Sequence, residues 1–398
     1  MQRQEWKLGS RRDKQCCPKT LDKMKRRKRM QFWGEDVNNM PIFDGHNDTL
    51  VKLYLPERGG GRSFLERSEK GHLDLPRARE AGFAGGFFAI FVPSPTVDYA
   101  ASLTRVSPKP DLLIRTENGY EVKLADPIDF DYAYEFTNEV ITSLFRLEEA
   151  AEGAIKVMRN IEELVDCLDQ NVLAVVLHFE GAEAIDPQLH NLEAFYQLGL
   201  RSLGITWSRP NAFGWGVPFK YPASPDIGPG LTEAGKELVR ACNELGIMLD
   251  LSHLNERGFW DVAKLSDAPL VATHSAAHAL TARTRNLTDE QLEAIGDSNG
   301  VVGVTFTVHD LRPDGGLEGD ASLTDLIRHI DYIAQRIGID HVAFGSDFDG
   351  ATIPKEMGDV TGLPRLLGAL REQGFDDAAL RKLTHENWIR VLRDTWND

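Results

Sequence analysis

From residue 41 onward, short apolar runs alternate with longer amphipathic segments. The short runs are rich in β-branched and aromatic residues, which favour extended structure, and the longer segments repeat apolar residues at helical spacing. Eight runs have strand character: 41–48, 84–92, 173–180, 200–207, 246–253, 269–274, 300–306 and 341–347. Alternating strands and helices are typical of a parallel α/β domain, and eight such strands predict a closed, TIM-like (β/α)8 barrel rather than an open sheet.

Two of the intervening segments have clear helix signals. In 232–246, Thr232 has the position of an N-cap and Gly246 that of the glycine which ends a helix. Segment 322–338 places apolar residues on a single stripe, namely Leu326, Ile327, Ile330 and Ile333. We expect these helices to belong to the outer ring of the barrel.

Two long segments, 93–153 and 208–230, interrupt the alternation after predicted strands. The second is dense in proline, glycine and aromatic residues. Barrel enzymes build their active sites from the loops that follow the strands, so both segments are predicted to form lids or walls of a substrate site. The chain has no internal repeat, and we expect one catalytic domain over residues 40–398.

The charge balance narrows the possible partners. The chain has 45 Lys and Arg against 61 Asp and Glu, and the net charge of −16 argues against a nucleic-acid or anionic-membrane partner. Residues 1–30 depart from this average, with 12 basic against 3 acidic residues. We expect residues 1–39 to be a basic, disordered tail, with Met30 or Met40 as alternative starts. A nucleic-acid-binding arm is the other interpretation of this tail.

Neither a membrane span nor a secretory signal is visible. The longest apolar run, 81–92, has 12 residues, whereas a spanning helix needs about 20. No apolar stretch of the signal-peptide type follows the basic tail. The four cysteines, Cys16, Cys17, Cys167 and Cys242, form no CxxC pair, so neither a zinc ribbon nor a disulfide framework is indicated. A reducing, cytoplasmic location is the expectation.

Polar residues at the strand ends carry the candidate chemistry. The carboxyl ends of barrel strands converge on one mouth. The residues at these ends are His46, Asp48, Glu180, Trp207, His253, His274 and Asp347. Burying so many imidazoles and carboxylates without partners is costly, and a metal centre provides the compensation. The set therefore predicts a metal site.

The number of these groups favours two metal ions. Three histidines and two carboxylates, with Asp347 besides, exceed the needs of one tetrahedral ion. Glu180 stands alone on its strand and is the natural bridge between a pair formed by His46 with Asp48 and a pair formed by His253 with His274. Imidazole with carboxylate suits zinc, while manganese, cobalt and iron stay open.

The remaining histidines have weaker claims to a metal. Those in polar or helical settings are expected at the surface: His72, His190, His329 and His341. His178, two residues before Glu180 on the same strand face, has either a ligand-orienting or a structural role. His278 could form a ligand pair with His274 only if a helix began at once.

Several motifs resemble the membrane (renal) dipeptidase family of zinc peptidases. They include "DGHND", "GFAGGFFAIFV", "FEGAEAI", "THSAAHALTARTRNLTDEQLEAI", "FGSDFDG" and "HENWIRVL", in an order that covers the chain from residue 41 to the end. The resemblance implies two zinc ions bridged by Glu180 and a hydroxide. The implied ligands are His46 and Asp48 for one ion and His253 and His274 for the other. It also suggests a homodimer.

The resemblance further implies the substrate contacts. Asp347, in "SDFDG", matches the aspartate that contacts the free amine and handles protons, and Asp349 is the weaker candidate. Arg285, in "RTRN", is similar to the arginine that binds the C-terminal carboxylate, a task suited to its planar fork. Without the motif, Arg285 would be interpreted as a surface or capping arginine.

The chain departs from the family pattern at two places. Thr206-Trp207 stands where family members have Thr-His, so the histidine expected to polarise the scissile carbonyl is missing. Trp207 could then shift substrate preference, or Arg209 or Asn211 could replace the lost function. The second departure, Thr305-Phe306-Thr307 in place of Asn-Phe-Tyr, puts one carboxylate contact in doubt.

The expected reaction is hydrolysis of a dipeptide. Zinc lowers the pKa of bound water from about 15.7 to roughly 7, so a hydroxide is available to attack the peptide carbonyl at neutral pH. Asp347 would transfer the proton to the departing amine. One alternative keeps the metals but takes another small substrate, such as an N-acyl amino acid, a lactone or a phosphoester. Another is a non-catalytic binding protein that has retained the barrel.

Overall fold

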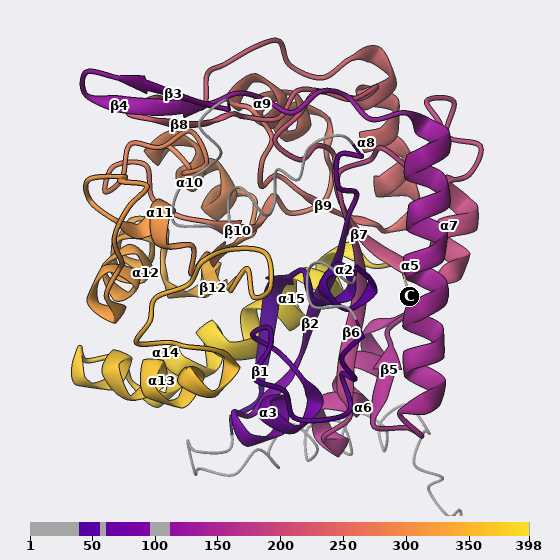
Figure 1. Ribbon diagram of the computed structural model, residues 1–398, viewed down its shortest axis with the longest axis vertical. Helices are drawn as coiled ribbons and strands as arrows, with labels where there is room; N and C mark the ends of the chain where they lie inside the picture. The colour runs from indigo at the N-terminus through magenta and orange to yellow at the C-terminus, as the bar shows by residue number, and fades with distance from the viewer. Residues whose placement is uncertain (1–39, 56–60, 96–111, 398) are drawn as a thin grey trace, which may run out of the picture.

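The computed structural model describes residues 40–55, 61–95 and 112–397. The basic tail predicted over residues 1–39 lies outside these ranges. Within them, a barrel of parallel strands occupies the centre and helices lie around it (Figure 1).

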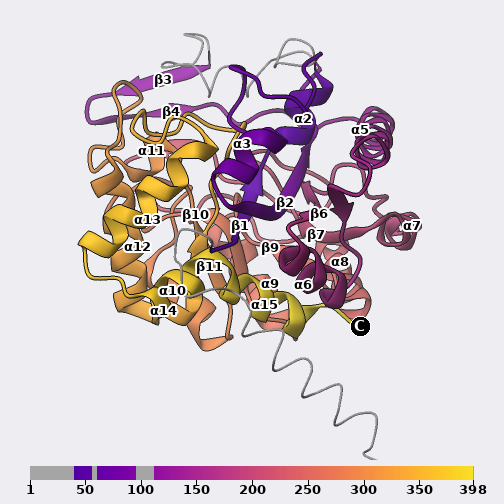
Figure 2. The same cartoon turned by 90° about the horizontal axis from the view of Figure 1, so that it is seen from below.

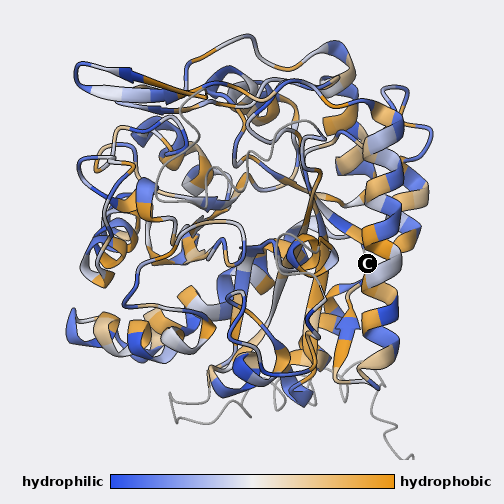
Figure 3. Cartoon of the chain, in the orientation of Figure 1, coloured by the Kyte–Doolittle hydropathy of each residue, from blue (hydrophilic) through white to orange (hydrophobic). Residues whose placement is uncertain are grey.

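Eight parallel strands are hydrogen-bonded in one continuous order, and they confirm the eight predicted runs. In that order they are β1 (Ile42–Asn47), β2 (Phe83–Phe91), β6 (Leu173–Glu180), β7 (Leu200–Gly204), β9 (Met248–Asp250), β10 (Val271–Ser275), β11 (Val301–Val304) and β12 (Val342–Phe344). A ninth, β5 (Ile155–Val157), adds to β6 from outside the path. Figure 3 shows apolar colouring along β2 and β6, as expected for strands buried on both faces.

The barrel is nearly closed by contacts between the first strand and the residues that follow the last. The amide of Asp347 donates to the carbonyl of His46 at 3.0 Å, and the amide of Asp48 donates to the carbonyl of Phe348 at 2.9 Å. These two bonds bring the two ends of the strand order together. They also set two predicted site residues, Asp48 and Asp347, next to each other at the mouth.

Helices surround the strands, as the view from below shows (Figure 2). They are α2 (Thr49–Tyr54), α3 (Leu75–Glu80), α5 (Phe130–Ala150), α6 (Ile161–Gln170), α7 (Leu192–Leu198), α8 (Glu233–Leu245), α9 (Glu256–Leu265), α10 (Asp289–Asp297), α11 (Val308–Leu311), α12 (Leu323–Ile337), α13 (Leu363–Glu372), α14 (Asp377–Arg381) and α15 (Asn387–Thr395). No helix in the described part of the chain has the length and apolar character needed to cross a membrane.

The two helices with clear sequence signals are confirmed. In α8 the side chain of Thr232 accepts from the amide of Gly235, and Gly246 ends the helix in the left-handed conformation. The four apolar residues predicted to share a stripe of α12 are all buried. His329, on the same helix, was expected at the surface, and this prediction is wrong. Its ring is fully buried, and both nitrogens have partners there. Nδ1 accepts from the amide of Ala277, and Nε2 donates to the carbonyl of Leu311.

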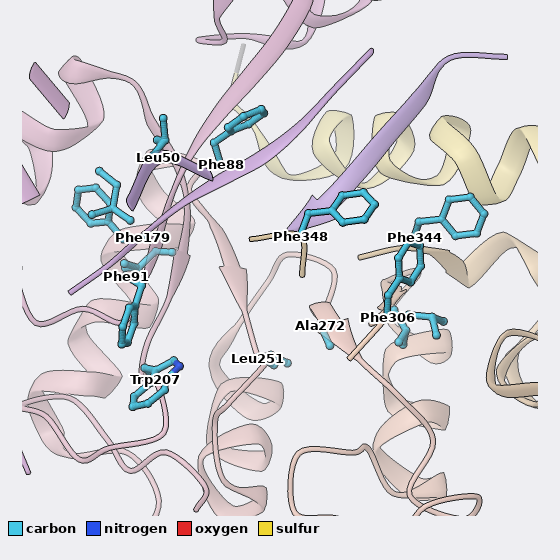
Figure 4. Packing of buried hydrophobic residues seen from close by; sticks show 14 of the residues in the cluster. Leu50, Phe88, Phe91, Phe179, Trp207, Leu251, Ala272, Phe306, Phe344 and Phe348 are labelled. Carbon is cyan, nitrogen blue, oxygen red and sulfur yellow. The ribbon is translucent and has the colours of Figure 1, made fainter. Parts of the chain in front are cut away.

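The C-terminal helix completes the core. Trp388 of α15 is fully buried, its Nε1 donates to the carbonyl of Phe344, and its ring lies 5.1 Å from that of Phe87. The strands admit this ring at Gly45 and Gly303, where an added Cβ would lie 2.5 and 3.0 Å from the indole. Trp388 and Phe87 belong to one of two apolar core clusters. Part of the second and larger cluster, including Phe344, Phe306 and Phe348, is visible in Figure 4.

The two long segments predicted as lids pair with each other. β3 (Leu113–Thr116) and β4 (Gly119–Val122) come from the first, β8 (Phe219–Tyr221) comes from the second, and the three form an antiparallel sheet beside the barrel (Figure 1). The hydroxyl of Tyr120 donates to the carbonyl of Gly315 and connects this sheet to the loop after α11. Residues 96–111 of the first segment lie outside the described ranges.

Candidate active site

The predicted ligands from four strands converge on the carboxylate of Glu180. One oxygen, Oε1, lies 3.0 Å from Nε2 of His253 and 3.7 Å from Nε2 of His274. The other, Oε2, lies 3.8 Å from Nε2 of His46. All four side chains are buried. Each carboxylate oxygen therefore faces a different part of the histidine set.

Two further carboxylates complete the side that contains His46. Oδ2 of Asp48 lies 3.5 Å from Nε2 of His46. His46, Asp48 and Asp347 each offer a ligand atom within 4.8 Å of the other two, and the same holds for His46, Glu180 and His274. On the other side, Nε2 of His253 and Nε2 of His274 are 3.1 Å apart. The structure thus brings together all five predicted ligands and Asp347.

Hydrogen bonds behind the histidines orient their rings. The hydroxyl of Thr273 donates its proton to Asp250 at 2.6 Å, so it accepts from Nδ1 of His274, at 2.9 Å. Nε2 of His274 is then left with a lone pair directed at the cluster. Nδ1 of His253 lies 2.9 Å from the hydroxyl of Ser208 in the same way.

Asp250 is a buried site residue that sequence reasoning missed. Besides the hydroxyl of Thr273, its carboxylate accepts from the amides of Thr273 and Ser252. It also lies 3.6 Å from Nε2 of His178. A carboxylate within the apolar run "GIMLDLSH" was the available signal, because an acidic residue in a buried strand requires partners.

Two ends of strands adopt a backbone conformation that is uncommon for residues other than glycine. His253 has φ of 66° and Asp347 has φ of 59°. Such left-handed positions are uncommon outside turns and cluster at functional sites. The unusual backbone coincides here with two side chains that enter the cluster.

The residues present fit a metal cation. Both ring nitrogens of His46 are buried and have no hydrogen-bond partner among the described residues. Burial raises the pKa of Glu180 well above its ordinary value and that of Asp347 to about 6. Burial lowers the pKa of His46, but the charges of Glu180, Asp48 and Asp347 outweigh it and raise that pKa to about 10. The cluster therefore stabilises positive charge at its centre, which a metal ion would supply.

His178 and His278 have different surroundings. His178 is fully buried, stands edge-on to the ring of His46 at 5.3 Å, and pairs through Nδ1 with the hydroxyl of Ser202. His178 therefore packs against the ring of the predicted ligand His46. Nε2 of His278 bonds the carbonyl of Ala223, so its ring is engaged outside the cluster.

A cavity opens beside the cluster. It is lined by Asp48, Glu180, His253 and Asp347 from the cluster and by Phe91, Trp207, Phe219, Arg283, Arg285, Thr307, His309, Asp310, Gly350 and Ala351. The predicted substrate contacts Arg285 and Trp207 are both among these residues. Phe219 comes from the second of the segments predicted as substrate walls.

Two buried arginines with different partners line this cavity. Arg283 forms an ion pair with Asp310. Arg285 donates from Nη2 to the carbonyl of His274 at 3.1 Å, and among the described residues no carboxylate lies within ion-pair distance of it. Arg283 and Asp310 were not predicted, because their pairing joins the segment after β10 to α11.

The structure does not bring Asn211 into the cavity. Its amide donates to the carbonyl of Ile205, and its Oδ1 accepts from the amides of Phe213 and Gly214. The side chain is therefore occupied in holding its own turn, and it is absent from the cavity lining within the described residues. The predicted substrate contact by Asn211 is not supported.

Arg209 and Asp349 are also engaged elsewhere. Nε of Arg209 pairs with Glu183 at 2.9 Å, and its Nη2 donates to the carbonyl of Val92. The carboxylate of Asp349 accepts from Thr49, from Arg62 and from the amide of His72, whose Nδ1 accepts from the amide of Asp349. His72 is thus half-buried and paired, not the surface group expected from sequence.

Comparison with known proteins agrees with a metal site at this position. The membrane dipeptidase family, peptidase family M19, matches residues 31–397. A metallopeptidase from Rhodobacter sphaeroides, solved with a phosphinate mimic of the dipeptide L-Ala-D-Ala, is 50% identical, with a TM-score of 0.84 over 90% of this chain and 100% of that one.

Two further relatives agree. The dipeptidase AC, a solved metallopeptidase of family M19, is 49% identical with a TM-score of 0.83, over 90% of this chain and 100% of its own. An uncharacterised protein in the pqqA 5′ region of Klebsiella pneumoniae is 48% identical over 271 residues, 68% of this chain and 98% of that protein. The chain belongs to the membrane dipeptidase family, peptidase family M19.

Proposed function

We propose that the protein is a dipeptidase whose active site holds two zinc ions. His46 and Asp48 would bind one ion, His253 and His274 the other, and Glu180 would bridge them. The observation that carries the proposal is the position of Glu180, whose two carboxylate oxygens face different members of a fully buried histidine set. A bridging carboxylate needs this two-sided arrangement.

The residues around the metals have roles that follow from their positions. When bound, the zinc ions would lower the pKa of a water molecule and polarise the substrate carbonyl. Asp347 lines the cavity, and the hydroxyl of Thr307 holds its Oδ2 at 2.8 Å. From this position the carboxylate of Asp347 can accept a proton and deliver it to the departing amine.

Groups of opposite charge in the cavity lining support a dipeptide as substrate. Asp347 and Asp48 offer negative charge to a free amine, and the guanidinium of Arg285 offers paired donors to a carboxylate. A site that binds both ends of its substrate selects for length, because the two charges must lie a fixed distance apart. The dipeptide mimic bound to the Rhodobacter sphaeroides metallopeptidase supports this choice.

The proposal is tested by supplying zinc and assaying a panel of L,L and L,D dipeptides. We expect hydrolysis of dipeptides, its loss after chelation and its return when zinc is restored. N-acetylated dipeptides and tripeptides serve as matched substrates, and they should be cleaved far more slowly because one charged end is blocked or displaced. Turnover of N-acyl amino acids or lactones without any dipeptide cleavage would instead select the alternative substrate class.

A further inference from the structure

One wall of the cavity is aromatic and continuous. The rings of Phe91 and Trp207 are 4.7 Å apart, and those of Trp207 and Phe219 are 5.8 Å apart. We call these three residues the aromatic wall; Figure 4 shows Phe91 and Trp207 side by side. They come from the end of β2, the residues after β7, and β8, so three separate elements build one surface. Aromatic rings arranged in this way offer a large apolar contact area.

The aromatic wall begins at the metal ligands. The ring of His253 lies 5.9 Å from that of Trp207 and 6.2 Å from that of Phe219. Any group that packs on the aromatic wall is therefore next to the reacting bond. In a dipeptide, such a group is the side chain of one of the two residues.

Buried ion pairs hold the aromatic wall at both ends and leave it neutral. The guanidinium of Arg209 lies 4.9 Å from the ring of Trp207 and 5.1 Å from that of Phe91, and Glu183 neutralises it. At the other end, Arg283 lies 5.3 Å from the ring of Phe219, and Asp310 neutralises it. Cations stacked on aromatic faces restrain the rings.

Among the described residues, no unpaired charge lies beside the aromatic wall, and the other charged groups of the cavity have proposed roles. Arg285 is reserved for the substrate carboxylate, and Asp48, Glu180 and Asp347 face the metals and the amine. An anionic substrate side chain placed on the aromatic wall would lose its hydration and gain no partner, and a cationic one would recover only part of that loss from the rings. An apolar side chain would gain contact area without this cost.

We infer that the protein selects dipeptides in which one residue has a large apolar side chain, and that Trp207 and Phe219 determine this specificity. The inference rests on the proposed function and names its substrate class. It also gives a positive role to Trp207, which occupies the place of a family histidine.

The test is a matched series of dipeptides in which each position in turn carries Gly, Ala, Leu, Phe, Asp or Lys. At one of the two positions we expect kcat/KM for Leu or Phe to exceed that for Gly, Asp and Lys by about tenfold or more. In Trp207→Ala and Phe219→Ala this preference should fall below about threefold, while the zinc content stays at the wild-type value. Phe130→Ala, on the exposed face of α5, is the matched control and should keep the full preference.

A second measurement is independent of turnover. Phosphinate mimics with Leu or Asp side chains should bind the wild-type protein with dissociation constants that differ by about tenfold or more. In Trp207→Ala the two dissociation constants should be about equal. A preference for a charged side chain, or an apolar preference that survives both substitutions, would overturn the inference. Hydrolysis of all dipeptides at similar rates would overturn it while leaving the proposed function intact, whereas inactivity toward every dipeptide would contradict the proposed function itself.

Discussion

At the scale of single residues, the roles proposed for metal binding and for handling of protons and substrate fall on different side chains. Glu180 lies among the histidines, whereas Asp347 reaches the cluster from the residues after β12 and accepts a hydrogen bond from the hydroxyl of Thr307. Arg285 stands in the cavity wall with one backbone partner. Substitutions at these positions should therefore produce different kinetic effects.

Asp347→Asn should reduce kcat by about 100- to 10,000-fold, because an amide cannot accept and return a proton. Zinc content should stay at the wild-type value if Asp347 acts on protons rather than as a required ligand. Steady-state kinetics together with metal analysis measure both quantities. Asp314→Asn, at an exposed position, is the control. An unchanged kcat would remove Asp347 from the mechanism.

Arg285→Met should lower kcat/KM for dipeptides by about 10- to 100-fold, since a charge-assisted bond to a carboxylate is worth about 1.5–3 kcal/mol. The loss should be much smaller for dipeptides with an amidated C-terminus, which have no carboxylate to bind. Arg328→Met, on the exposed side of α12, serves as the matched control. Equal losses for free and amidated dipeptides would show that Arg285 does not contact the carboxylate.

Gly350→Ala should disturb the site without unfolding the protein. An added Cβ would lie 2.0 Å from Oδ2 of Asp48 and 2.3 Å from Oδ1 of Asp347, so both carboxylates must shift. We expect at least about a tenfold loss of zinc affinity, in the range seen when groups that orient ligands are changed. Gly368→Ala, whose Cβ meets nothing within 4 Å, is the control. Wild-type zinc affinity in Gly350→Ala would contradict the close approach.

At the scale of elements, buried histidines connect the outer helices to the barrel. His329 of α12 bonds the backbone of Ala277, after β10, and of Leu311, at the end of α11. Burial lowers the pKa of His329 to about 4. The ring must stay neutral to accept from one amide and donate to one carbonyl.

This arrangement predicts a pH-dependent contribution to stability. The unfolded imidazole has a pKa near 6.5, so protons bind the unfolded chain more tightly than the folded one. The contribution of His329 is fully present above pH 6.5 and is lost as the pH falls toward 4, by roughly 3 kcal/mol in total. His329→Gln keeps a donor and an acceptor but does not titrate, so its free energy of unfolding should fall less between pH 7 and pH 5. Denaturant unfolding at both pH values checks this, and parallel losses in the two proteins would contradict it.

The elements of the barrel were largely predictable from the sequence. All eight strands and the helices α8 and α12 have periodic apolar patterns or caps that act locally, which is why their positions were found. The small sheet of β3, β4 and β8 was not predicted. The pairing of β4 with β8 joins residues about 100 positions apart and has only a weak local signal. The pairing of β3 with β4 is a local hairpin, and Asn118-Gly119 was the signal that could have found it. The burial of His329 was missed for a related reason, since its two partners come from other elements.

At the scale of the whole molecule, barrel topology turns a scattered set of residues into one site. Positions from 46 to 347 meet because every strand ends at the same mouth. The ligand set could therefore be predicted from strand ends alone. The pairing of Arg283 with Asp310 could not, because it joins the segment after β10 to α11. The engagement of Asn211 within its own turn is local, but it becomes visible only from the hydrogen bonds of that turn.

The central claim is that two metal ions share Glu180 at this mouth, and the most direct test is the zinc content per chain after dialysis. We predict two ions for the wild-type protein, two for the control Glu318→Gln at an exposed position, and at most one for Glu180→Gln. Circular dichroism would establish that all three chains are folded. A wild-type chain that binds no more than one ion, or a Glu180→Gln chain that retains two, would contradict the account.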